Sequence, residues 1–224
     1  MALSSTYVGG YMVLQIRWHG HSCFEITNDA TIVTDPHDGK SIGIPAPSVL
    51  ADIILVSHDH YDHNSVKSVQ KETSTVVTSE KKRTIATIPI EGVPSFHDES
   101  RGQKRGKNII FHFTMDDIRF CHLGDLGHLL DQQTVESIGP IDILFIPIGG
   151  TFTLDAQQAW EVINILQPKI VVPMHYKIGG LSLPIASIDP FLEQNKYRVL
   201  KVGNEIDIEK EDLPPEPEVW TFTL

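Results

Sequence analysis

The segment Ser57-His58-Asp59-His60-Tyr61-Asp62-His63-Asn64, written SHDHYDHN, places three histidines and two aspartates within six consecutive positions. It directly follows Ile53-Ile54-Leu55-Val56, a short apolar run that is typical of a strand buried on both faces. The segment is therefore expected on a loop at the carboxyl end of a strand, which is a common position for functional side chains. Imidazole nitrogens and carboxylate oxygens are the ligands that zinc and similar ions prefer in hydrolytic sites.

The spacing His58-x-His60-x-Asp62-His63 offers four ligands, and a turning loop can direct some of them to one side and the rest to the other. Such a loop can serve two metal positions about 3.5–4 Å apart, but two ions need further ligands. Three further ionisable residues are placed as the SHDHYDHN segment is, directly after an apolar strand-like run: His97, Asp125 and His175.

The remaining pattern indicates one sheet-rich domain with interspersed helices. Further strands are predicted at residues 13–18, 23–26, 31–34, 90–96, 109–114, 118–123, 143–146, 170–172 and 197–202. Asp155 is expected to cap a helix with an apolar stripe, which Pro168 stops. A second helix is expected from Asp131 to Ser137, closed by Gly139-Pro140. We expect a polar tail over residues 1–11 and a single domain over 12–224.

Several strings together identify a resemblance: WHGHSCFEI, TDP, SHDHYDHN, SFHDESRGQKRGKN, HLGDLGH, PIGGTFTLD and VPMHY. Over about residues 16–208 the chain resembles the metallo-β-lactamase superfamily. Within it, the chain is most similar to the uncharacterised metal-dependent hydrolase branch that also contains ascorbate-6-phosphate lactonases. The resemblance implies an α+β fold, a four-layer αββα sandwich with the site at one edge.

Carried over residue by residue, the resemblance implies that His58, His60 and His97 hold one metal ion. Asp62, His63 and His175 would hold the other, and Asp125 would bridge the two. Asp35 matches an aspartate that supports the ligands from behind them. The alternative for Asp35 is an Asp-Pro turn that ends the strand over residues 31–34.

Other residues are candidates for catalysis or substrate binding. His21 matches a Gly-His of this branch and is expected either to act with Asp62 in catalysis, by proton transfer, or to be structural. Arg105 and Lys177 lie near predicted ligands and are candidates for binding an anionic substrate group, against the alternative of solvated surface charges. Strand alternation should turn His122 away from the site, so it is excluded as a ligand.

Composition narrows the class of protein. The chain has 224 residues, 41% of them hydrophobic, and a formal net charge of −11. That charge argues against nucleic-acid binding, which requires Lys and Arg at phosphates. The two cysteines, Cys23 and Cys121, are expected to be buried rather than disulfide-bonded. No membrane span or export signal is visible, so we expect a cytoplasmic protein without a membrane partner; a homo-oligomer stays open.

These features predict a metal-dependent hydrolase with two divalent ions, zinc foremost and manganese, nickel or iron as alternatives. A hydroxide bound to the metal pair would attack a small ester, lactone or phosphodiester. Only 33 residues separate His63 from His97, which leaves little room for the extra domain of nucleic-acid-cleaving relatives. Two rival hypotheses are a di-iron redox enzyme of the same fold and a non-catalytic metal or ligand sensor.

Overall fold

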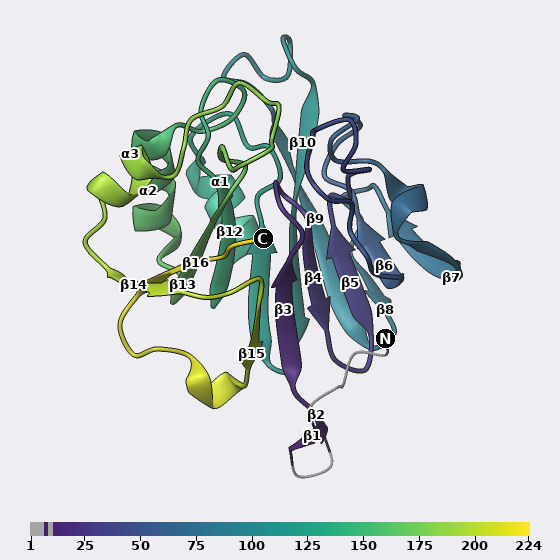
Figure 1. Ribbon diagram of the computed structural model, residues 1–224. Coiled ribbons are helices and arrows are strands. Elements are labelled where there is room, and N and C mark those ends of the chain that lie inside the picture. Colours follow the sequence, from purple (N-terminus) through teal and green to yellow (C-terminus); the bar gives the residue numbers. More distant parts are fainter. Residues whose placement is uncertain (1–6, 9–10) are drawn as a thin grey trace.

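Two β-sheets face each other in the computed structural model, which describes residues 7–8 and 11–224 (Figure 1). One sheet has six strands in the order β15-β3-β4-β5-β6-β7. Their bounds are Leu14–Trp18 (β3), Phe24–Thr27 (β4), Thr31–Thr34 (β5), Ala51–Leu55 (β6), Gln70–Val77 (β7) and Glu205–Ile208 (β15).

The other sheet has eight strands in the order β14-β16-β13-β12-β11-β10-β9-β8. Their bounds are Arg83–Ile85 (β8), Ile88–Phe96 (β9), Lys107–Met115 (β10), Ile118–His122 (β11), Ile143–Pro147 (β12), Ile170–Met174 (β13), Arg198–Lys201 (β14) and Glu218–Thr221 (β16). Because β10 pairs antiparallel with both β9 and β11, and β11, β12 and β13 are parallel, the carboxyl ends of β9, β11 and β13 lie at the same edge.

The main hydrophobic core lies between the sheets and contains residues of both. Strand β6 shows why its sequence is apolar throughout. Ile53 and Leu55 pack into this core, whereas Ile54 and Val56 pack into a second cluster on the outer face of the six-stranded sheet. The predicted burial of this strand on both faces is confirmed.

The α-helices lie on the side of the eight-stranded sheet in Figure 1: α1 (Gln132–Ile138), α2 (Ala156–Leu166) and α3 (Asp189–Glu193). Helix α2 begins at a capping box in which Asp155 and Gln158 bond each other's backbone, and it ends at Gln167 in a left-handed conformation. Helix α1 begins at Asp131 and ends at Gly139. Both predicted helices and their caps are confirmed.

The opposite layer is thinner. The outer face of the six-stranded sheet is covered by Val49, Val66 and Val69 around the short 3-10 helix η1 (Val66–Ser68). A second 3-10 helix, η2 (Lys210–Asp212), follows β15. The predicted α+β sandwich is confirmed, with its heavier helical layer on one side. Of the described helices, none is both long and apolar enough to cross a bilayer.

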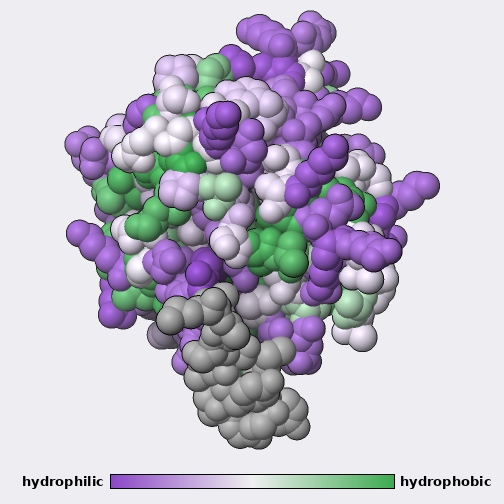
Figure 2. All heavy atoms as spheres, turned by 45° about the vertical axis from the view of Figure 1, so that its right-hand side comes forward, coloured by the Kyte–Doolittle hydropathy of each residue, from purple (hydrophilic) through white to green (hydrophobic). Residues whose placement is uncertain are grey.

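The predicted strands are present, with ends shifted by at most two residues, and Cys23 and Cys121 are both buried, as predicted. The sequence did not indicate β7, β8, β15, β16 or α3. The predicted tail over residues 1–11 falls largely outside the described residues; of that stretch, β1 (Tyr7–Val8) pairs with β2 (Tyr11–Met12). Figure 2 shows a largely hydrophilic face with smaller hydrophobic areas.

Candidate metal centre

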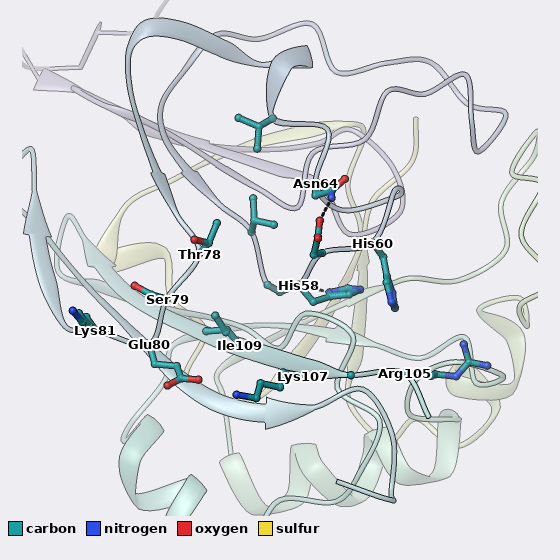
Figure 3. A pocket seen from close by; sticks show the side chains of 15 residues that line it. His58, His60, Asn64, Thr78, Ser79, Glu80, Lys81, Arg105, Lys107 and Ile109 are labelled. Atoms are coloured by element: carbon teal, nitrogen blue, oxygen red, sulfur yellow. Dashed lines mark hydrogen bonds between the residues drawn. The ribbon is translucent and has the colours of Figure 1, made fainter. Parts of the chain in front are cut away.

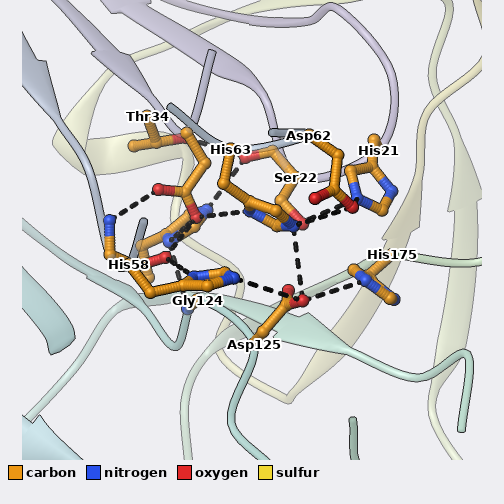
Figure 4. Close-up of polar contacts among 12 residues, drawn as sticks. His21, Ser22, Thr34, His58, Asp62, His63, Gly124, Asp125 and His175 are labelled. Atoms are coloured by element: carbon orange, nitrogen blue, oxygen red, sulfur yellow. Dashed lines mark hydrogen bonds and ion pairs between the residues drawn. The ribbon is translucent and has the colours of Figure 1, made fainter. Parts of the chain in front are cut away.

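Five separate chain segments bring nitrogen and oxygen donors together, four of them at the edge where β6, β9, β11 and β13 end and the fifth between β3 and β4. Their common point is Oδ2 of Asp125, which lies 3.1 Å from Nε2 of both His97 and His175. The same oxygen lies 3.3 Å from Nε2 of His63 and 3.8 Å from Nε2 of His58 (Figure 4). The sequence predicted this convergence of residues that are up to 117 positions apart, counted from His58 to His175 (175 − 58).

The donors fall into two groups on either side of Asp125. We call His58, His60 and His97 the outer group, and His21, Asp62, His63 and His175 the inner group; within each, one donor atom per residue lies within 4.8 Å of every other. All four inner side chains are buried, whereas His60 is partly exposed. The two groups match the two predicted ligand sets, with His21 added to one of them.

This donor set fits divalent cations. Oδ1 of Asp125 and Nε2 of His58 are buried and have no hydrogen-bond partner within the described chain. Buried polar atoms are normally paired, so unpaired ones that converge on one point indicate a missing partner. Imidazole and carboxylate donors without thiolates suit zinc, manganese, nickel and iron.

Asp35 lies behind both groups and fixes the orientation of two imidazoles. Its Oδ2 lies 3.1 Å from Nδ1 of His63 and accepts a 2.7 Å hydrogen bond from Oγ of Ser57. That hydroxyl oxygen in turn lies 2.9 Å from Nδ1 of His58. With the protons held on both Nδ1 atoms, the Nε2 lone pairs of the neutral rings face the centre. This is the supporting place that the sequence suggested for Asp35.

The backbone at Asp125 is held by residues that the sequence reasoning missed. The amide N–H of Asp125 donates to Oδ1 of Asn108, whose Nδ2 donates to Oγ of Ser95 and to the carbonyl of Leu123. Gly124 has φ +57°, and a Cβ there would lie 2.3 Å from Oδ1 of Asn108. Only glycine fits this approach. The Gly-Asp pair at residues 124 and 125 marked this position in the sequence, but no local pattern identified Asn108 as the residue that binds the backbone N–H of Asp125.

Burial and neighbouring charges set the pKa values of the ring nitrogens. Burial, followed by the nearby His63, lowers the pKa of His58 to about 3; burial and His175 lower that of His21 to about 3. For His63 burial acts in the same direction, but Asp125 and then Asp35 outweigh it and hold its pKa well above the usual value. His58 and His21 are therefore neutral near pH 7, the form in which imidazole binds metal.

A cavity of about 1100 Å³ opens beside the outer group (Figure 3). His58 and His60 line it, and no inner-group residue does. Three cations also line it, Lys81, Arg105 and Lys107. The structure thus brings Arg105 to the same cavity as two predicted ligands.

Asp98 organises the loop that carries Arg105. Its carboxylate accepts hydrogen bonds from four backbone N–H groups, those of Ser100, Gly102, Lys104 and Arg105, at 2.7–3.0 Å. The Arg105 guanidinium lies 4.2 Å above the centre of the Phe152 ring. The loop therefore holds the Arg105 guanidinium in a defined place.

The structure does not bring Lys177 to this cavity. Its Nζ donates to the carbonyls of Leu181, at a short distance, and of Leu183 at 3.0 Å, which braces the chain after β13. Nε2 of His122 donates a hydrogen bond to the carbonyl of Ser22, and its Nδ1 accepts one from the backbone N–H of Gly124. Both of its nitrogens are occupied, in agreement with its exclusion as a ligand.

Comparison with known proteins adds to this geometry. Residues 15–175 match the family model described as a beta-lactamase superfamily domain. A protein of Thermoplasma volcanium named UPF0173 metal-dependent hydrolase is 30% identical, over 92% of this chain and 100% of that protein. A crystal structure from Thermotoga maritima, of a protein described as a proposed zinc-dependent hydrolase of the metallo-β-lactamase superfamily, is 37% identical with a TM-score of 0.77, covering 93% of this chain and 98% of that one.

A more distant solved structure shows how widely the fold is shared. CmlA, a diiron β-hydroxylase of Streptomyces venezuelae, is 14% identical with a TM-score of 0.56, covering 73% of this chain and 45% of that chain. At this identity the likeness shows the fold alone, and one fold hosts many chemistries.

Proposed function

Because the chain belongs to the metallo-β-lactamase superfamily, we propose that it is a hydrolase that uses two divalent metal ions to cleave a small ester, lactone or phosphodiester. One observation carries the proposal: Oδ2 of Asp125 lies within 3.1–3.8 Å of four imidazole nitrogens from three other chain segments. The place of the chain in the ascorbate-6-phosphate lactonase branch stays a prediction from its motifs.

In this proposal the outer group holds one ion, Asp62, His63 and His175 hold the other, and Asp125 contacts both. Zinc fits the donor set, with manganese, nickel or iron as alternatives. When bound, such a pair lowers the pKa of a coordinated water to about 7 and so supplies a nucleophile at neutral pH. Asp62, whose Oδ2 lies 3.6 Å from Nε2 of His63, would orient that nucleophile and relay a proton.

The cavity supports a small substrate with an anionic group. Its volume of about 1100 Å³ is near the upper limit for small-molecule sites. Arg105 is the cation we assign to the anionic group, because the Asp98-centred loop fixes its backbone. A guanidinium forms paired hydrogen bonds to a carboxylate or phosphate.

The deciding experiment combines metal analysis with a substrate panel. Protein purified without chelator or nickel resin is expected to contain about two ions per chain. It should hydrolyse members of a lactone panel or bis-p-nitrophenyl phosphate, and exhaustive chelation should abolish that activity. Turnover by a sample shown to be metal-free would overturn the proposal, as would oxygen consumption without hydrolysis.

Arg105→Ala tests the assigned substrate contact. A charge-assisted hydrogen bond contributes about 1.5–3 kcal/mol, so KM for an anionic substrate should rise roughly tenfold or more while kcat changes little. Arg101→Ala is the matched control, since Arg101 lies on the same loop but does not line the cavity. Equal effects of the two variants would remove Arg105 from the site.

A further inference from the structure

We propose that His21 is a direct ligand of the metal ion held by Asp62, His63 and His175, so that the inner ion has one protein ligand more than the outer one. This inference rests on the proposed two-metal site and concerns a residue for which the sequence suggested proton transfer or a structural role.

The distances place His21 among the ligands rather than behind them. Its Nε2 lies 3.1 Å from Oδ2 of Asp62 and 3.1 Å from Nε2 of His63. Its ring centre lies 4.3 Å from that of His175. Donors bound to one ion at about 2.0–2.2 Å are separated by roughly 3.0–3.5 Å, which brackets these contacts. Figure 4 shows the His21 ring directed at the same point as its neighbours.

Hydrogen bonding alone accounts for this arrangement poorly. Nδ1 of His63 is directed at Asp35, so in the neutral ring, which is the form that binds metal, Nε2 of His63 presents a lone pair toward His21. Nε2 of His21 thus faces two acceptors at equal distance and has at most one proton to offer them. A cation between these atoms would satisfy all three donors together.

The backbone holds His21 in an uncommon conformation at this point. His21 has φ +54°, as does His175. The carbonyl of His21 accepts hydrogen bonds from the backbone N–H of His175 and the indole N–H of Trp18. Non-glycine residues in the left-handed region persist only where the surrounding structure fixes them, and they concentrate at functional sites. Two such histidines, bonded to each other through the backbone, form one unit of the inner group.

The consequence is an asymmetric pair of ions. With Asp125, the inner ion would have five protein donors in a buried position, and the outer ion would have four beside the cavity. A nearly saturated, buried ion has little room for substrate. Substrate therefore approaches the ion held by His58, His60 and His97.

The test uses His21→Gly, which suits the positive φ and leaves a space of imidazole size. The measurement is metal affinity by competition with a chromophoric chelator, together with the visible spectrum of the cobalt-substituted protein. Loss of an outer-shell partner costs about 10–100-fold in metal affinity, and loss of a ligand should cost at least the upper end of that range, for one ion only. Added imidazole should restore both the affinity and the cobalt spectrum.

Two further variants separate the possible roles. His21→Gln keeps an amide that can donate to Asp62 but is a poor ligand, so it should bind the inner ion as weakly as His21→Gly does. His112→Ala removes a histidine outside both groups and should leave both affinities unchanged.

Each outcome decides a different claim. If the wild type binds two ions and His21→Gly or His21→Gln binds them with unchanged affinity, the ligand role of His21 is overturned and the two-metal proposal stands. If the wild type itself binds fewer than two ions, both fall. Weakened binding of one ion with rescue by imidazole supports the ligand role.

Discussion

Two buried aspartates lie at opposite ends of the parallel strands of the eight-stranded sheet, and we call these two ends its edges. They show how differently the same side chain can be used. Asp142 precedes β12, and its two oxygens accept hydrogen bonds from Arg119 and Lys210 at 2.8–3.0 Å. Asp125 follows β11, and its nearest partners are imidazoles, with one oxygen unpaired. Arg119 and Lys210 of the chain itself neutralise the charge of Asp142. The negative charge of Asp125 faces imidazoles and is available to bind metal cations.

This contrast teaches that burial of a carboxylate does not by itself mark a functional site. Both aspartates have side chains at most 2% exposed, and in both cases hydrogen bonds or charged neighbours outweigh burial and hold the pKa well below its usual value. What distinguishes them is the kind of partner. Matched variants at the two positions should therefore separate function from stability.

The largest effect is expected for Asp125→Asn. The amide of Asn lacks the negative charge that would bind both ions, so metal content should drop. Because bound metal stabilises the transition state by several kcal/mol, kcat/KM should fall on the order of 1000-fold. Asp142→Asn is the control, because it should keep both metal content and activity. An Asp125→Asn protein with activity within tenfold of wild type would contradict the role assigned to Asp125.

A smaller effect is expected behind the ligands. Asp35→Asn should lower activity about 10–100-fold, because Asp35 orients His63 directly and His58 through Ser57. Ser57→Ala removes only the branch to His58 and should lower activity less. The two variants are compared by activity measured across a range of metal concentrations. A Ser57→Ala loss as large as that of Asp35→Asn would show that Asp35 acts on the outer group alone.

Much of this metal edge was readable from the sequence, because each ligand follows an apolar strand. His97, Asp125 and His175 could be recognised by that local pattern, and the chain geometry then brought them together. Asn108 and Asp98 could not, since they act through backbone amides distant in sequence or within a loop, and no periodicity marks them. Lys177 lies close to the ligand His175 in the sequence, yet its ammonium group donates hydrogen bonds to nearby backbone carbonyls instead of facing the cavity.

The opposite edge was invisible to sequence reasoning. Asp142 stands before a predicted strand, but its partners come from β11 and from η2, 68 positions further along the chain. The weakly patterned strands β7 and β15 were missed for a related reason: their residues are mostly exposed or partly exposed, so their sequences carry no clear apolar period. Tertiary pairing, and not local preference, fixes these elements.

At that edge, Asp142→Asn should reduce stability rather than activity. Hydrogen bonds to charged groups contribute about 1.5–3 kcal/mol, and both cations can regain water, so a loss of about 2 kcal/mol is expected in urea unfolding near pH 7. A loss of metal or of hydrolysis in this variant would break the separation between the two edges.

The pH dependence of this stability has a defined sign. Burial would raise the pKa of Asp142, but the hydrogen bonds from Arg119 and Lys210 outweigh it and hold that pKa below its usual value. The contribution is therefore present above the unfolded pKa of about 3.9 and is lost as pH falls through the lower, folded value. The stability difference between wild type and Asp142→Asn should be constant from about pH 8 to 5 and shrink below about pH 4.

The smallest effect is expected for Lys210→Ala. The Lys210 side chain is 37% exposed, and its Nζ lies 3.0 Å from Oδ2 of Asp142. Arg119 still donates to both oxygens of Asp142 in this variant, so the carboxylate keeps most of its neutralisation. Because Lys210 is partly exposed and can regain water, the loss of stability should lie in the range found for exposed ion pairs, about 0.2–1 kcal/mol, and should shrink in high salt. Urea unfolding at low and high salt measures it, and a loss as large as that of Asp142→Asn would mean that Lys210, not the Arg119 fork, neutralises this edge.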